Sequence, residues 1–348
     1  MDRLESIKFE IQNTASDYID DTFSFLNECI PMAKNASDTL KDYTPLLSTS
    51  TANTLTKVKN FDMETNAKLI AETKEIIAKL DADIQRSVEQ FNQKCSYTKV
   101  HLGVVSKDIT QFKAMLKNNI SDIDSLDHQG RSPLFLAVIT GHFDTAKALI
   151  EAGADVNQCG HENKSPLFIA TALGRADLVQ LLIDNKAKVN LADLHGLTPL
   201  HITSFIGNTE ILDILLESKA KVNQADVRGR TGLQLAAIAN QSLVLQRLLD
   251  KNASTSHQDK AGRTALHHGL LSQSSECVDI LTPVSKLDVK DKQGRDALFY
   301  ASLVEDQKSV EALLKLGVLR DNADSNGLSA LTIANKLNNK KIQQLIRS

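Results

Sequence analysis

Apolar and polar positions recur with a fixed period along most of this chain. The clearest sign is a leucine that returns every 33 residues, with one step shortened to 32. These leucines are Leu134, Leu167, Leu200, Leu233, Leu266, Leu298 and Leu331. A glycine precedes each of them by four residues except at Asn163, and asparagine also tolerates left-handed backbone. Seven copies in phase predict an architecture of stacked repeats.

Each copy has the pattern of a turn followed by two short helices. In the copy that begins at Asp193, residues 193–196 have turn chemistry, with Asp first and Gly last. Thr198 can cap the next helix, and Pro199 suits its first turn. A second helix with one apolar face follows, marked by Ile211, Leu212, Leu215 and Leu216. Two short helices cannot bury an apolar face alone, so neighbouring copies must cover it.

Residues 1–95 follow a different pattern and contain no glycine, which suits long helices. Apolar residues recur every seven positions in two stretches and predict amphipathic helices at about 2–30 and 54–93. These positions are Leu4, Ile11, Tyr18 and Phe25, and then Met63, Ile70, Ile77, Ile84 and Phe91. The two helices predict a hairpin or small bundle, with a self-associating coiled coil as the alternative. The acidic residues of the first helix, including Asp17, Asp20 and Asp21, fit a solvated helix face.

Residues 94–126 keep the apolar positions of a copy but lose its turn residues. Val104 precedes Ala137 by 33 positions, and Leu116 precedes Leu149 by the same interval. This stretch is predicted to be a degenerate first repeat that ends the core, or the surface on which the N-terminal helices dock. The expected domains are therefore 1–95 and 96–348, with a lysine-rich last helix as the C-terminal cap.

The copies resemble the ankyrin repeat. The family pattern D-x-x-G-x-T-P-L-H-x-A, followed by G, L-L and G-A-x-V-N, is met almost fully at residues 193–223 and closely at 127–157. The resemblance extends over about residues 94–348, and the N-terminal region resembles no family. It implies an all-α solenoid of helix-turn-helix repeats. It also implies a non-catalytic protein that holds a partner protein in the concave groove of the array.

The composition indicates the cellular compartment and argues against several kinds of binding site. The net charge of −3 gives no sign of a nucleic-acid binder. The four cysteines are scattered without a C-x-x-C pair, which argues against a zinc site or a disulfide framework. The N-terminus lacks the apolar segment of a secretory signal, and no run reaches the ~18 apolar residues of a membrane span. We therefore expect a cytoplasmic protein without a cofactor.

The candidate catalytic residues are few. His201 and His267 occupy the histidine position of the T-P-L-H motif, and His142 follows the glycine between two helices, where the family uses histidine structurally. Cys95 and His101 lie six residues apart, but nothing supplies the orienting acid that a thiol nucleophile needs. Phosphate-binding glycine loops are absent. The sequence predicts that the chain is not an enzyme.

The candidate binding residues lie in the turns and at the ends of the first helices. Five of the six turns considered carry Arg or Lys just after the glycine position, which predicts a basic row suited to an acidic partner segment. The alternative is that basic residues at this position are ordinary in the family. Residues Phe205 and Ile206, beside Leu194 and Leu197, are predicted to form an apolar centre. The expected partner-binding set is Arg131, Lys164, Leu194, Leu197, Phe205, Ile206, Arg228, Arg230, Arg263 and Arg295.

Two accounts of the biological role remain open from the sequence. In the first, the chain is an adaptor whose repeats bind one protein with an acidic or apolar segment. In the second, it is a secreted effector of an intracellular bacterium that targets a host protein in the host cytoplasm. Residues 1–95 would then be a second functional module. In either account the same residues could instead mediate self-association.

Overall fold

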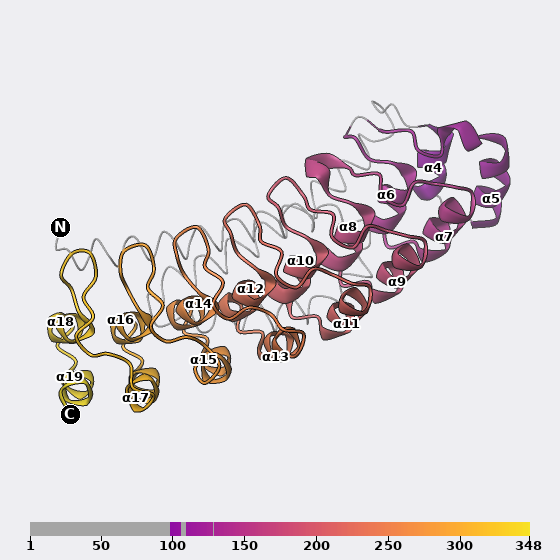
Figure 1. The fold of residues 1–348 in the computed structure, drawn as a ribbon. Coiled ribbons are helices and arrows are strands. Elements are labelled where there is room, and N and C mark those ends of the chain that lie inside the picture. Colours follow the sequence, from indigo (N-terminus) through magenta and orange to yellow (C-terminus); the bar gives the residue numbers. More distant parts are fainter. Residues whose placement is uncertain (1–97, 106–108, 128) are drawn as a thin grey trace.

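The computed structural model describes residues 98–105, 109–127 and 129–348 (Figure 1). The N-terminal hairpin, the coiled coil, self-association and Cys95 fall outside the described residues. Within the described part, regular structure is helical apart from two isolated bridges, Ala225–Thr231 and Ala323–Ser329. None of the described helices is long and apolar enough to cross a membrane.

The described helices form eight consecutive pairs. We call the first member of each pair the inner helix and the second the outer helix. The inner helices are α4 (Lys99–Val105), α6 (Pro133–Ile139), α8 (Pro166–Ala172), α10 (Pro199–Ile206), α12 (Gly232–Ile238), α14 (Ala265–Leu271), α16 (Ala297–Leu303) and α18 (Ala330–Lys336). The outer helices are α5 (Ile109–Asn118), α7 (Phe143–Glu151), α9 (Ala176–Asp184), α11 (Thr209–Glu217), α13 (Ser242–Asp250), α15 (Ser275–Leu281), α17 (Gln307–Lys315) and α19 (Lys340–Arg347). Two short 3₁₀ helices, η2 (Ile120–Asp122) and η3 (His161–Asn163), lie in the loops.

The pairs stack side by side into one elongated, curved array (Figure 1). Each inner helix packs against the inner helix of the next pair, and the outer helices form a second row. Long loops project along the opposite edge from the outer helices. The predicted solenoid of stacked helix pairs is confirmed for the described residues.

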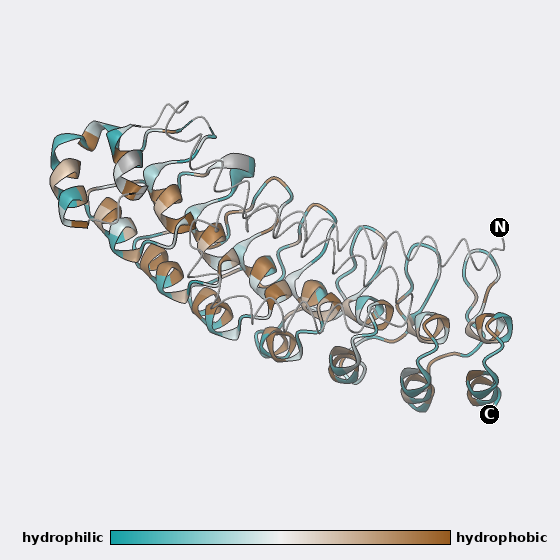
Figure 2. Cartoon of the chain, turned by 180° about the vertical axis from the view of Figure 1, so that it is seen from behind, coloured by the Kyte–Doolittle hydropathy of each residue, from teal (hydrophilic) through white to brown (hydrophobic). Residues whose placement is uncertain are grey.

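One continuous core runs through the stack. The recurring leucine is buried in six of its seven copies, and the buried apolar residues from α4 to α19 form a single cluster. Figure 2 shows the hydrophobic colour concentrated on the helices and the hydrophilic colour on the loops. Leu331, in the pair α18 and α19, is only half-buried.

A left-handed residue separates the inner from the outer helix in every copy from α6 onward. Three copies use glycine, at Gly141, Gly174 and Gly207, where a positive φ carries no steric penalty. The other four are Asn240, Gln273, Glu305 and Asn338. The position is therefore a constant of the backbone, even where the residue type is not glycine.

The copy that contains α14 and α15, where the period shortens to 32 residues between Leu266 and Leu298, departs from the others. Its outer helix ends at Leu281 after 7 residues, and Thr282 then continues in right-handed helical geometry. The neighbouring outer helices α9, α11 and α13 instead end near left-handed residues at Lys186, Lys219 and Asn252. The chain thus leaves this copy by a different path, just before Pro283.

Candidate protein-binding surface

An aspartate shapes the turn before six of the eight inner helices. In the turn of Asp193, one carboxylate oxygen accepts the amide hydrogens of His195 and Leu197 at 2.9 and 2.8 Å. The same pair of bonds occurs at five more turns, those of Asp127, Asp226, Asp259, Asp291 and Asp324. These six turns therefore have one common shape.

Consecutive turns are joined to one another through their backbones. The amide of Val227 donates to the carbonyl of His195 at 3.0 Å, and the amide of Lys260 donates to the carbonyl of Arg228 at 2.9 Å. Equivalent bonds link Leu194 to Glu162, Lys292 to Ala261 and Ser325 to Gln293. The loop tips therefore form a hydrogen-bonded strip in addition to the packed helices below them.

Glycine is required where one turn approaches the next. Gly196 has φ +74°, and a Cβ at this position would lie 2.8 Å from the backbone nitrogen of Val227. Gly262 has φ +82°, and a Cβ there would lie 2.7 Å from the nitrogen of Lys292. The close approach thus adds a second reason for glycine beyond the left-handed backbone.

In four of these turns the residue after the aspartate is a large side chain that points outward. Leu194 is 67% exposed and Val227 is 47% exposed, and Lys260 and Lys292 are also exposed. We call these four residues the loop row. Its first half is apolar and its second half is basic, on a strip of backbone that is already ordered.

The predicted basic row is not on the surface at most of its positions. Lys164 is 1% exposed, Arg230 4%, Arg263 4% and Arg295 2%. For these four residues, the prediction that the side chain is exposed to a partner is wrong. Only Arg131 and Arg228 among the predicted basic residues are partly exposed.

For Arg230 and Lys164 the burial follows from a bond to an acidic residue of the same turn. The Nε atom of Arg230 donates to the second carboxylate oxygen of Asp226 at 2.6 Å, and Arg131 contacts Asp127 in the same way at 2.7 Å. The turn at Lys164 has no aspartate, and its ammonium group donates to Glu162 at 2.8 Å. In these three turns the basic residue thus bonds an acidic residue of its own turn.

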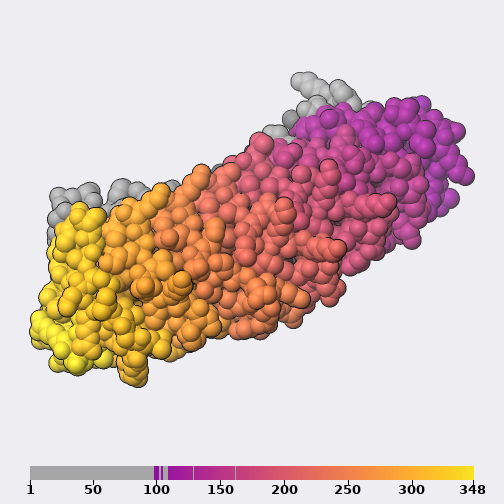
Figure 3. All heavy atoms as spheres, viewed as in Figure 1, coloured from indigo at the N-terminus to yellow at the C-terminus, as the bar shows by residue number. Residues whose placement is uncertain are grey.

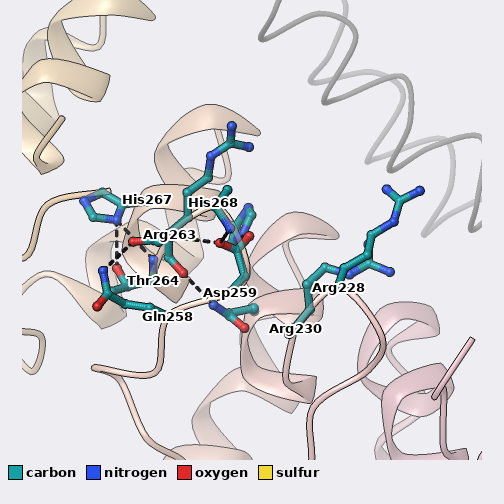
Figure 4. Close-up of polar contacts among 12 residues, drawn as sticks. Arg228, Arg230, Gln258, Asp259, Arg263, Thr264, His267 and His268 are labelled. Atoms are coloured by element: carbon teal, nitrogen blue, oxygen red, sulfur yellow. Dashed lines mark hydrogen bonds and ion pairs between the residues drawn. The ribbon is translucent and has the colours of Figure 1, made fainter. Parts of the chain in front are cut away.

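In two later turns another side chain takes the second carboxylate oxygen. His268 Nε2 lies 2.9 Å from Asp259 Oδ2, and the Tyr300 hydroxyl donates to Asp291 Oδ2 at 2.6 Å. Figure 4 shows the Asp259 carboxylate facing His268 while the side chain of Arg263 extends away from it. Arg295 lies with its Nε 3.7 Å from Asp324 of the next turn, over the ring of Phe299.

The predicted apolar centre is divided by the structure. Leu197 is buried, and its amide is one of the two donors to Asp193. Phe205 and Ile206 lie at the end of α10, half-buried and packed against the core. Leu194 alone of the four is strongly exposed.

The histidines of the T-P-L-H position tie copies together, as the resemblance implies. His201 Nδ1 accepts the amide hydrogen of Thr198 at 3.1 Å, so Nε2 carries the proton and donates to the carbonyl of Arg230 at 3.1 Å. Gln234 makes the same two contacts in the next copy, at 2.8 Å to Thr231 and 2.8 Å to Arg263. Burial lowers the pKa of His201, which keeps the imidazole neutral in this role.

His101 also has a structural role. Its two ring nitrogens contact the hydroxyl of Thr98 at 2.9 Å and the carbonyl of Arg131 at 3.0 Å. His142 Nδ1 donates to the carbonyl of Val104 at 3.1 Å, across the boundary between two copies. In the described part of the chain, no three His, Cys, Asp or Glu side chains gather where they could hold a metal ion.

Of the loop row, the sequence pattern predicts only Leu194, because it places the binding residues at the basic position after the glycine. The Asp-x-x-x-Arg spacing that returns at residues 127–131 and 226–230 could have shown that the arginine serves its own turn. The position directly after the aspartate would then have remained as the outward one. Val227, Lys260 and Lys292 belong to the candidate surface for this reason.

Comparison with protein families gives one result. A model of ankyrin repeats, built from three copies, matches residues 73–160, 100–193, 155–226, 200–288 and 233–321. The first of these ranges begins at residue 73, upstream of the domain boundary expected at residue 95. Among curated proteins, none matches the chain significantly.

Proposed function

Because the chain belongs to the ankyrin repeat family, we propose that it is a non-catalytic binding protein that holds a partner protein along the loop row. The observation that carries this proposal is the pair Leu194 and Val227. These are large apolar side chains, 67% and 47% exposed, on adjacent turns that a backbone hydrogen bond joins. Exposed apolar groups at neighbouring positions on an ordered scaffold are typical of an interaction site.

The composition of the loop row defines the chemistry of the partner. Leu194 and Val227 favour an apolar contact, while Lys260 and Lys292, one and two copies further on, favour carboxylates. Arg228 is half-buried between the two halves and adds a positive charge there. The partner segment therefore has an apolar end and an acidic end, and it runs along the array from α10 towards α16.

The inner helices extend this surface beneath the loops. Phe205 and Ile206 are half-buried at the end of α10, where a partner side chain can contact them. Arg230 holds its own turn through Asp226. Because the turns are bonded to each other before binding, the partner meets a surface with little conformational freedom left to lose.

The test compares the full-length chain with the double variant Leu194→Ser/Val227→Ser. The matched control is Leu243→Ser on the outer helix α13. Leu243 is 72% exposed and lies outside the loop row. Partners are captured from the source cells and quantified by mass spectrometry for all three proteins.

We expect one or more proteins to be retained by the wild type and the control and reduced at least tenfold by the double variant. Circular dichroism melting checks that the fold is intact in each. Equal retention by the double variant and the control would remove the loop row from the proposed function.

A further inference from the structure

A second charged surface lies on the opposite edge of the array, at the ends of the outer helices. It consists of two pairs of exposed lysines at equivalent positions of two successive copies and one lysine at a different position of the third, which we call the lysine edge. These residues are Lys186, Lys188, Lys219, Lys221 and Lys251. In Figure 1 the ends of α9, α11 and α13 lie along the edge away from the loop tips.

Some cations beside the outer helices have acidic partners, but the five lysines of the edge do not. Arg175 pairs with Asp177 at 2.6 Å, Arg247 pairs with Asp213, and Lys315 pairs with Glu311 at 2.8 Å. None of the five lysines of the edge forms an ion pair with another described residue. Their charges are therefore available to a partner.

Two of the lysines occupy a backbone conformation that glycine fits better. Lys186 has φ +69° and Lys219 has φ +64°, while the equivalent residues Gly153 and Gly317 are glycines with φ +100° and +82°. A left-handed conformation costs a residue with a Cβ about 1 kcal/mol. Strain kept at two successive copies, each time at a lysine, points to a use for the charge.

An asparagine of the preceding copy fixes the backbone at each position. Asn157 accepts the amide hydrogen of Lys188 at 2.7 Å and donates to the carbonyl of Lys186 at 3.4 Å. Asn190 holds Lys221 and Lys219 in the same way, at 2.7 and 3.3 Å. The backbone at these two pairs of lysines is thus held in the same way in two successive copies, whereas the third copy has Asn252 and Ser254 at the equivalent positions.

The distance between equivalent lysines of two successive copies determines the charge spacing that a ligand needs. Packed helices lie about 8–10 Å apart, so equivalent lysines of successive copies are separated by about the same distance. Carboxylates that recur every seven residues on an α-helix are separated by about 10 Å. A helix with this acidic spacing matches the step of the lysine edge.

Acidic residues beside the lysines favour a protein over a nucleic acid as the ligand of the lysine edge. Asp184, Glu217 and Asp250 are exposed beside the lysines, one in each copy. Duplex DNA carries a charge about every 1.7 Å along its axis and would place phosphates against these carboxylates. A helix with spaced acidic residues can avoid them.

We propose that the lysine edge is a second docking surface, which binds an acidic helix of a partner protein whose carboxylates recur every seven residues. The chain then binds two partners at once, one at the loop row and one at the lysine edge. The second surface is independent of the first, so each can fail without the other.

The probe is a labelled 28-residue helical peptide of Ala, Gln and Glu, with Glu at positions one and five of each heptad. Its control is a peptide of the same composition in which the Glu residues are shuffled out of this spacing. Binding to the full-length chain is measured by fluorescence anisotropy at low salt. A duplex DNA of 24 base pairs serves as a third probe.

Three double variants isolate the surface. Lys186→Gly/Lys219→Gly removes two charges and relieves the strained backbone, so its melting temperature should equal or exceed that of the wild type. Lys188→Ser/Lys221→Ser removes the charges of the two lysines whose amides bond Asn157 and Asn190. Lys308→Ser/Lys315→Ser makes the same charge change on α17, where both lysines already have acidic partners.

We expect both edge variants to weaken binding of the heptad peptide at least threefold and the α17 variant to leave it unchanged. We also expect the shuffled peptide to bind at least threefold more weakly than the heptad peptide. Equal effects of the edge and α17 variants, equal binding of the two peptides, or tighter binding of the DNA would each overturn the proposal.

Discussion

His268 Nε2 lies 2.9 Å from Asp259 Oδ2, with both side chains almost fully buried. In the preceding copy the same carboxylate oxygen, on Asp226, accepts from Arg230. In the following copy, on Asp291, it accepts from the hydroxyl of Tyr300. Three successive turns therefore use three different donors for one acceptor, and each keeps the same turn shape.

Charge is distributed unequally within the His268–Asp259 pair. Burial lowers the pKa of His268, although the carboxylate acts against this shift. Burial alone would raise the pKa of Asp259, but hydrogen bonds from His268 and from the turn outweigh it and leave the pKa below its usual value. The pair is therefore a neutral imidazole that donates to an ionised carboxylate.

The buried histidines make the array sensitive to acid. Burial lowers the pKa of His201 and His268, and it lowers the pKa of His267 to about 3. The unfolded chain binds these protons from about pH 6.5 downward, whereas the folded chain does not. The free energy of unfolding is therefore greatest above pH 6.5 and falls as the pH decreases, by up to about 1.4 kcal/mol per pH unit for each histidine.

The variant His267→Gln tests this dependence, since Gln234 already makes the equivalent contacts in another copy. We expect its loss of stability between pH 7.5 and pH 5 to be smaller than that of the wild type by about 2 kcal/mol. Urea unfolding followed by circular dichroism at both pH values gives the comparison. An unchanged loss in the variant would show that His267 does not titrate on unfolding.

A comparison of Gly196 with Gly130 separates the two reasons for glycine in the turns, which are the left-handed backbone and the close approach of the next turn. Both have positive φ, at +74° and +71°, but a Cβ on Gly130 meets no atom within 4 Å. Gly130→Ala should cost about 1 kcal/mol for the left-handed backbone alone. Gly196→Ala should cost more, since its Cβ would lie 2.8 Å from the nitrogen of Val227.

The readout for these two variants is urea unfolding together with hydrogen exchange. Gly196→Ala should accelerate exchange of the Val227 amide, which donates to His195 in the neighbouring turn. Gly130→Ala should leave that amide protected. The same exchange rate in both variants would contradict the close packing of adjacent turns.

Asn190 tests the bonds between copies on the other edge. Its side chain contacts Lys221 and Lys219 of the next copy at 2.7 and 3.3 Å. Asn190→Ala should lower the free energy of unfolding by about 1–2 kcal/mol and speed exchange of the Lys221 amide. The control is Asn185→Ala, because Asn185 bonds only Leu181 within its own helix.

Exchange confined to the region around Lys221 would match the view that each copy depends mainly on its neighbours. Uniform acceleration through the whole array, or none at Lys221, would contradict the role given to Asn190.

The sequence predicts the backbone of the array better than its surface. The period of 33 residues places the leucines, the turn glycines and Asn163 correctly. The leucines are needed to fill the core, and the glycines and Asn163 are needed for the left-handed backbone of the turns. Asn163 has φ +60°, as its residue type allows. The caps at Thr198 and Pro199 also follow from sequence alone.

The exposure of charged side chains could not be predicted in the same way. Arg230 and Arg228 are two residues apart in one turn, yet the first is buried on Asp226 and the second is partly exposed. The outcome depends on which donor reaches the carboxylate, and His268 and Tyr300 arrive from nine residues further along. Such contacts depend on the folded turn, which the periodic pattern does not describe.

The central claim is that a partner protein binds along the loop row. A photo-crosslinking amino acid placed at Leu194 or Val227, and separately at Leu243 on α13, tests it most directly in the source cells. We predict a discrete crosslinked species at Leu194 and Val227, with the same partner identified by mass spectrometry, and none at Leu243. The same crosslinked proteins at all three positions, or none at Leu194 and Val227, would contradict the account.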